Sequence, residues 1–292
     1  MLFRSGHEID SQNVDYTKDT ANTTLNLHNG KLLAAWYNSG RMHRLDPLTL
    51  DTEGEENFSG ALDTTMNAHG KTDPRTGEFI NYGYADFQSW LTYYVIGADG
   101  ALRHKTRIDL PGPRLPHDTT ITRNFTILHD FPLFHDPELL KRTNHRIVQF
   151  RRDLPTRFGV LPRYGTQEQI RWFEFEPGYV LHMVNAWEEG DWIIMDGCFQ
   201  PDPTIRRDPS EGPLGSMLAY LRYKGHLRRW RMNLRTGEQQ ERQLDDLNVE
   251  FCLPDADLYG VKSRYSYHQL IPTDLQTLAF RSEEHTSELQ SH

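Results

Sequence analysis

The feature that most constrains this chain is a long series of short strand-like segments that are separated by turn residues. Residues 22–27 and 31–37 flank Asn29-Gly30, a dipeptide that favours the two-residue turn of a β-hairpin. Residues 179–195 likewise alternate in polarity, turn through Gly190 and return as an apolar run. Segments with the period of an amphipathic helix do not alternate with these strands. The pattern therefore predicts an all-β fold.

Composition narrows the class of protein. The 292 residues are 37% hydrophobic and 25% charged, which is typical of a globular domain with a sizeable core. No run approaches the ~18 apolar residues of a membrane-spanning helix, and no signal peptide opens the chain. The two cysteines are too few for a disulfide framework, so we expect a reducing, cytoplasmic environment. The net charge of −9 gives no reason to expect a nucleic-acid partner.

Three histidines lie at or beside strand-like segments, and their spacing is informative. His69 and His117 are 48 residues apart, and His182 follows after a further 65. Four-stranded propeller blades recur at roughly 40–50 residues, so this spacing places about one histidine in each blade. The innermost strands of a propeller converge on its axis, where neutral imidazoles from separate blades form a metal site. The donor type suits zinc as well as iron and leaves the metal open.

Five segments resemble the carotenoid cleavage oxygenase family, which includes carotenoid, apocarotenoid and lignostilbene dioxygenases and the retinal pigment epithelial membrane protein. They occur in the family's order and are HGKTDPRTGE, LPHDTTIT, PTRFGVLPRYG, RWFEFEPGYVLHMVNAWEEGD and LDDLNVEFCLP. The resemblance implies a seven-bladed β-propeller, of which this chain contains about four blades. It also implies a non-haem Fe(II) dioxygenase that uses O2 to cleave a carbon–carbon double bond into two carbonyl products.

In that family four histidines hold the iron, and His69, His117 and His182 match the first three. The fourth belongs near the C-terminus of the full-length enzyme and is absent from this chain. Glu250 matches the carboxylate that hydrogen-bonds the third ligand, here His182. The carboxylate behind the second ligand has no match, because Tyr37 or Asn38 stands there. The resemblance thus implies that the second ligand, His117, lacks the carboxylate partner that it has in the family.

Substrate recognition is expected to be apolar. Stilbene-cleaving members carry a lysine beside the carboxylate that is missing here, and Trp36 or Tyr37 takes its place. This favours a carotenoid or apocarotenoid polyene over a stilbene, which remains the alternative substrate. Trp36, Phe131 and Phe134 are candidates for lining a substrate tunnel, and residues 131–134 are also a candidate for peripheral membrane contact in the parent enzyme.

The ends of the chain carry a separate expectation. Residues 281–292, RSEEHTSELQSH, resemble the in-frame translation of a sequencing-library adapter, so we expect a non-native tail there. Residues 1–280 are then an incomplete oxygenase domain, an internal fragment that we expect to be inactive without the remaining blades and the fourth histidine.

Two other classes of function remain open. A non-enzymatic propeller that serves as an interaction scaffold has no reason to direct three histidines to one axial point. A zinc hydrolase would use the same donors and is separable by metal analysis. The remaining histidines lack comparable surroundings and are expected on the surface or in loops, among them His28, His129 and His268.

Overall fold

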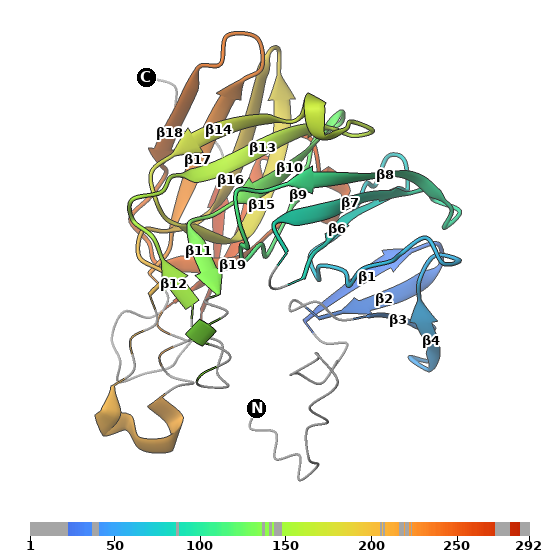
Figure 1. The fold of residues 1–292 in the computed structure, drawn as a ribbon, viewed down its shortest axis with the longest axis horizontal. Helices are drawn as coiled ribbons and strands as arrows, with labels where there is room; N and C mark the ends of the chain where they lie inside the picture. The colour runs from blue at the N-terminus through green and yellow to red at the C-terminus, as the bar shows by residue number, and fades with distance from the viewer. Residues whose placement is uncertain are drawn as a thin grey trace.

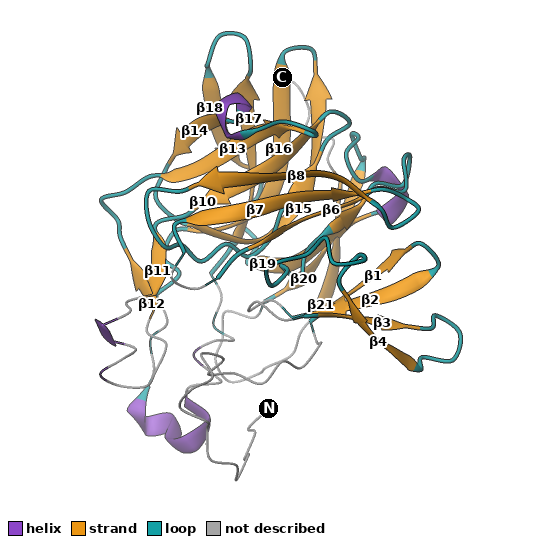
Figure 2. Ribbon diagram, turned by 45° about the vertical axis from the view of Figure 1, so that its right-hand side comes forward, coloured by secondary structure: helices purple, strands orange, loops and turns teal. Residues whose placement is uncertain are grey.

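The chain folds into a succession of antiparallel sheets (Figure 1). The computed structural model describes residues 23–36, 41–85, 88–135, 138–139, 142, 148–204, 206, 208–215, 219, 222, 224–271 and 281–286. Within these residues, strands predominate, and the expectation of an all-β fold is confirmed (Figure 2). The helical elements with assigned bounds are the short 3-10 segments η1 (Gln167–Gln169), η2 (Pro209–Leu214) and η3 (Ala256–Leu258).

Four of the sheets have four strands each. The first contains β1 (Thr24–His28), β2 (Lys31–Ala35), β3 (Met42–Leu45) and β4 (Thr52–Glu56). The second contains β5 (Lys71–Thr72), β6 (Phe79–Gly83), β7 (Trp90–Ile96) and β8 (Leu102–Asp109). The third contains β9 (Thr120–Ile121), β10 (Phe125–Asp130), β13 (Thr156–Pro162) and β14 (Arg171–Phe175). The fourth contains β15 (Tyr179–Glu189), β16 (Trp192–Gln200), β17 (His226–Asn233) and β18 (Gln239–Gln243).

Two smaller sheets accompany them. β11 (Leu133–His135) and β12 (Val148–Phe150) form a hairpin between two strands of the third sheet. β19 (Val249–Pro254), β20 (Tyr265–Leu270) and β21 (Arg281–Thr286) form a three-stranded sheet. The segment that the sequence set apart as a tail therefore begins with a strand that pairs with β20. Its non-native origin stays a prediction, and residues 287–292 lie outside the described residues.

In five of the six sheets of the described part, all but the β11–β12 hairpin, the first strand lies beside the first strand of a neighbouring sheet. β1 contacts β5, β9 contacts β15, and β15 contacts β19. An isolated parallel bridge between His69 and Asp118 connects the second sheet to the third. First strands that line a common centre are the arrangement of propeller blades. Side chains from four sheets consequently meet in the centre.

The core consists of apolar layers between successive sheets. Leu33 and Phe79 belong to the layer between the first and second sheets, and Tyr93 belongs to the next layer. Phe158 and Trp230 pack edge to face at 5.1 Å in the layer between the third and fourth sheets. The second, third and fourth sheets are therefore covered by neighbours on both faces, which fixes the directions from which their first strands approach the centre. None of the helices in the described part is long and apolar enough to cross a membrane.

Candidate metal centre

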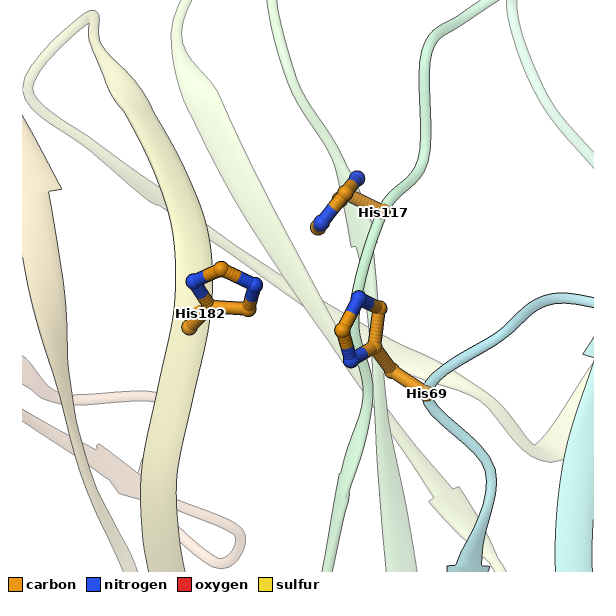
Figure 3. Close-up of side chains that lie close together, drawn as sticks. All are labelled: His69, His117 and His182. Atoms are coloured by element: carbon orange, nitrogen blue, oxygen red, sulfur yellow. The ribbon is translucent and has the colours of Figure 1, made fainter. Parts of the chain in front are cut away.

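Three segments from different sheets bring their histidines to one point (Figure 3). His69 lies in the segment just before β5, His117 lies just before β9, and His182 lies within β15. One ligand-capable nitrogen from each of the three side chains lies within 4.8 Å of the other two. The ring centroids are 4.6 Å apart for His69 and His117, 4.9 Å for His69 and His182, and 5.1 Å for His117 and His182. The chain thus gathers, from positions 48 and 65 residues apart, the side chains that the sequence singled out.

A β-bulge positions His182. Val180 pairs with Phe199, and the next paired residue, Met183, faces Gly197, so Leu181 and His182 are left out of the ladder. A bulge bends the strand and re-aims its side chains, which is why it is common beside functional sites. His182 consequently points out of its own sheet toward His69 and His117 (Figure 3).

A second irregular strand supplies the partner of His182. Glu250 on β19 is fully buried, and its Oε2 lies 2.6 Å from Nδ1 of His182. The register of β19 against β20 shifts between Glu250 and Leu253, and Phe251 has a φ of +53°. The backbone N–H of Phe251 also donates to Glu250 Oε2. The carboxylate therefore holds the proton of His182 on Nδ1 and leaves Nε2 as the free acceptor.

The donor set fits a metal ion. Nε2 of His69 is buried and has no hydrogen-bond partner among the residues that the structure describes, which is costly for a polar atom unless another group binds it. Bonds of about 2.0–2.1 Å to one ion place pairs of nitrogens roughly 3–4 Å apart. The observed limit of 4.8 Å is slightly wider, so small rotations of the rings would close the set. Neutral imidazoles with one anchored tautomer are the ligands that a divalent transition metal requires.

Burial and charge set the protonation of the three rings. Burial lowers the pKa of both His69 and His117 well below the ordinary value, and the neighbouring histidines lower it further. Burial also lowers the pKa of His182, but the charge of Glu250 and its hydrogen bond outweigh burial, so the net pKa of His182 is raised. Two of the rings are therefore neutral over a wide pH range, and His182 is the ring at which a proton competes with a metal ion.

Lys71 and Asp118 are site residues that the sequence analysis did not single out, although both stand in the quoted segments around His69 and His117. Their buried side chains form an ion pair, with Nζ 2.6 Å from Oδ1. Lys71 Nζ also donates to the carbonyl of His69, at 2.8 Å. Asp118 Oδ2 accepts from the backbone N–H of Met183, at 2.7 Å. Their position in the sequence could have indicated them, since Lys71 lies two residues after His69 and Asp118 directly follows His117.

The expectation that the other histidines lie on the surface is wrong for three of them. His28, His129 and His268 are at most 3% exposed. Nε2 of His129 accepts the backbone N–H of His117 at 3.2 Å, and its ring stacks on Phe131 with centroids 4.0 Å apart. His129 thus supports the segment that carries His117. Local sequence did not reveal this, because the contact joins residues on two different chain segments.

The remaining candidates have mixed outcomes. Phe131 is 1% exposed and packs against Phe158 and Tyr179, so the structure places it in the core between the third and fourth sheets. Phe134 is partly buried, and the guanidinium of Arg114 lies 4.1 Å from its ring centroid. Trp36 is partly buried and directly follows β2. A tunnel-lining role for these three side chains stays a prediction. Tyr37 and Asn38 lie outside the described residues.

Comparison with known proteins identifies the family. The family model described as retinal pigment epithelial membrane protein matches residues 2–285. A carotenoid 9,10(9′,10′)-cleavage dioxygenase of Crocus sativus is 34% identical over 261 residues, which cover 88% of this chain and 47% of that protein. An isoeugenol monooxygenase of Pseudomonas putida is 31% identical and covers 91% of this chain and 56% of its own length.

A solved structure agrees with these relatives. The lignostilbene dioxygenase of Pseudomonas brassicacearum superposes with a TM-score of 0.75 at 28% identity, over 86% of this chain and 53% of the other. The chain thus spans about half the length of the relatives that it matches. The family-model match covers almost the whole sequence, and the fold agrees. The chain belongs to the retinal pigment epithelial membrane protein family, the family of the carotenoid cleavage oxygenases.

Proposed function

We propose that this chain provides three ligands of a non-haem Fe(II) site in an oxygenase that cleaves a carbon–carbon double bond with O2 and yields two carbonyl products. One observation carries the proposal: His69, His117 and His182 converge within 4.8 Å, and Glu250 anchors the third. The matched relatives are named as dioxygenases and monooxygenases, which supports this reaction class. The parent enzyme is then an oxidoreductase of carotenoid or phenylpropenoid catabolism.

Iron is the metal that the family resemblance favours, while the donor set by itself also accepts zinc. Three neutral imidazoles leave the full +2 charge on a bound ion, because no ligating carboxylate offsets it. A bound Fe(II) supplies the redox chemistry with O2 that the protein's side chains lack. Zinc has no redox chemistry, so a zinc hydrolase is the competing hypothesis that metal exchange distinguishes.

The chain's own residues bind the ion, orient the ligating histidines and exclude water from the centre. Glu250 keeps the proton of His182 on Nδ1, so that Nε2 faces the other two rings. The Lys71–Asp118 pair and the ring of His129 hold the backbones of the ligand segments. Since His117 and Glu250 are at most 9% exposed, water has little access to the side of the centre that they cover. These groups preorganise the site before an ion arrives.

An apolar substrate suits the border of the centre. The ring of Phe251 lies 5.3 Å from the ring of His182 and is 44% exposed, so an aromatic surface adjoins the histidines. A polyene such as a carotenoid or apocarotenoid has the apolar, electron-rich double bonds that such a surface accommodates. A stilbenoid is the second candidate, because a solved lignostilbene dioxygenase superposes on most of this chain.

Location and other partners follow as part of the proposal. The net charge of −9 disfavours a nucleic-acid partner. We propose a cytoplasmic enzyme that takes up its substrate through peripheral contact with a membrane. The competing scaffold hypothesis is disfavoured by the buried Nε2 of His69, which has no hydrogen-bond partner in the described part of the chain. An interaction scaffold has no use for such an atom at its centre.

The test is metal-dependent turnover. The chain, and any longer reading frame that contains it, would be loaded anaerobically with Fe(II) or Zn(II) and exposed to ¹⁸O2 with an apocarotenal, a stilbene and isoeugenol. We expect labelled carbonyl products from the longer reading frame with Fe(II) only, with the apocarotenal favoured, none from its His182→Ala variant, and none from the 292-residue chain alone. Equal turnover with zinc, or no product from any iron-loaded form that retains the ion, would overturn the proposal.

A further inference from the structure

A second group of metal-binding side chains lies behind the histidine centre. Cys198 on β16, Cys252 on β19 and His268 on β20 are each at most 4% exposed. Their ligand-capable atoms all lie within 4.8 Å of one another. The two sulfurs and one nitrogen differ in chemistry from the all-nitrogen set of His69, His117 and His182. This second group stands independently of the proposed oxygenase function.

The distances suit a tetrahedral ion. Zinc binds sulfur at about 2.3 Å and nitrogen at about 2.0–2.1 Å, which places a sulfur and a nitrogen of one tetrahedron roughly 3.6 Å apart. Cys198 Sγ lies 3.7 Å from Nδ1 of His268. Without an ion, the same distance corresponds to a weak hydrogen bond between the thiol and the ring nitrogen. The observed separation is compatible with two ligands of a common ion.

The imidazole of His268 is oriented as a ligand. Its Nε2 lies 2.8 Å from Oγ of Ser266, two residues earlier on β20. A ligating histidine normally donates its second ring N–H to an oxygen, which fixes the tautomer and directs the other nitrogen toward the ion. With the proton on Nε2 and donated to Ser266, the lone pair of Nδ1 faces Cys198.

The group joins two sheets at a place where they must stay in register. Cys198 belongs to the fourth sheet, and Cys252 and His268 belong to the three-stranded sheet. Cys252 Sγ also contacts the backbone oxygen of His182 at 3.4 Å, and Glu250 lies two residues before Cys252 on the same strand. A link between the sheets here would hold Glu250 against His182.

We propose that Cys198, Cys252 and His268 supply three protein ligands of a separate site for a sulfur-binding d¹⁰ cation of the Zn²⁺ type. Binding replaces the two thiol protons, which leave to solvent, and the resulting unit of one Zn²⁺, two thiolates and one neutral imidazole carries no net charge. A neutral unit avoids the large cost of burying an unpaired ion. The site acts as a cross-link between the fourth sheet and the strand that carries Glu250.

The competing interpretation is that the two cysteines serve only as apolar core residues. Cys198 and Cys252 also belong to the apolar layer that contains Val184 and Val249, and buried thiols often serve as small hydrophobic side chains. A disulfide between the two cysteines is a third possibility, in which both thiols are oxidised by two electrons in total by O2 or a peroxide and both protons leave. The three interpretations predict different products on addition of a metal ion.

Co²⁺ distinguishes them, because cobalt bound to thiolate absorbs in the near ultraviolet through sulfur-to-metal charge transfer and cobalt bound only to imidazole does not. The chain has only these two cysteines. Any such band from the reduced wild-type protein therefore reports this group. We expect the band in wild type and in His69→Ala, its loss in Cys198→Ser and in His268→Ala, and its disappearance when Zn²⁺ displaces Co²⁺.

The wild-type measurement alone decides the matter even if the variants fail to fold. Absence of the charge-transfer band in reduced, folded wild type after Co²⁺ addition would overturn the proposal in favour of an apolar core. A mass two daltons below the reduced value, with no thiol released on unfolding, would overturn it in favour of a disulfide. Zinc retained at one equivalent by His69→Ala, with both thiols protected from alkylation until a chelator is added, is the supporting result.

Discussion

Lys71 and Asp118 form a buried ion pair that touches the chain beside all three histidines of the centre. The pair joins Nζ to Oδ1 at 2.6 Å, Lys71 bonds the carbonyl of His69, and Asp118 bonds the N–H of Met183. Asp118 itself follows His117 in sequence. One pair of side chains thus fixes the backbones of three segments that belong to different sheets.

Removal of the cation from this pair should destabilise the protein strongly. In Lys71→Met the carboxylate of Asp118 stays buried without its positive partner, and we expect the free energy of unfolding to fall by about 3–5 kcal/mol. Urea unfolding measures the change. The matched control is Lys105→Met, since Lys105 and Asp63 are also 2.6 Å apart but have side chains that are 32% and 62% exposed. The control should lose less than about 1 kcal/mol, and equal losses would contradict the proposed role of burial.

Glu250 should control metal retention. In Glu250→Gln the anchor of the His182 tautomer loses its charge, and we expect affinity for a divalent ion to weaken by on the order of 10–100-fold. Anaerobic titration with Fe(II) or Co(II) gives the dissociation constant. Glu174→Gln is the control, because Glu174 is exposed on β14, the strand of the third sheet at the opposite edge from β9. Unchanged affinity in the Glu250 variant would show that the carboxylate has only a structural role.

Metal affinity should depend on pH through a single proton. The pKa of His182 is raised, whereas burial holds the pKa values of His69 and His117 well below the ordinary value. As pH falls through the pKa of His182, that ring is protonated first, so affinity should fall by about tenfold per pH unit with one proton taken up. In Glu250→Gln the onset should move to lower pH. A loss that involves two or three protons at once would be inconsistent with the different environments of the rings.

Alanine variants of Phe131 and Phe134 should distinguish a role in core packing from a role in substrate contact. Phe131 is 1% exposed and packs on His129, Phe158 and Tyr179, so Phe131→Ala should lower the free energy of unfolding by about 3–5 kcal/mol. Phe134→Ala removes a partly buried ring under Arg114 and should cost about 1 kcal/mol. Chemical denaturation compares the two. A Phe131→Ala variant of unaltered stability but altered substrate preference would instead support a tunnel-lining position.

The sequence by itself determined the features that depend on neighbouring residues. Asn29 and Gly30 have positive φ angles of 48° and 71° and join β1 to β2, as their residue types predicted. Alternation and turn residues likewise predicted strands around Gly190. The identity and spacing of His69, His117 and His182 pointed to a common centre before any contact was known. Turns and strand alternation depend on residues that are close in sequence. The capacity of histidine to bind a metal is a property of the residue type itself.

Only the tertiary structure decided which side chains meet. The bulges that direct His182 and Glu250 toward each other arise from pairing with β16 and β20, and local sequence does not encode such a register shift. The burial of Lys71, Asp118 and His129, and the meeting of Cys198 with His268, likewise require strands that are distant in sequence. The physical reason is that a buried polar group finds its partner only when sheets pack face to face. That packing depends on the whole arrangement of sheets rather than on any one segment.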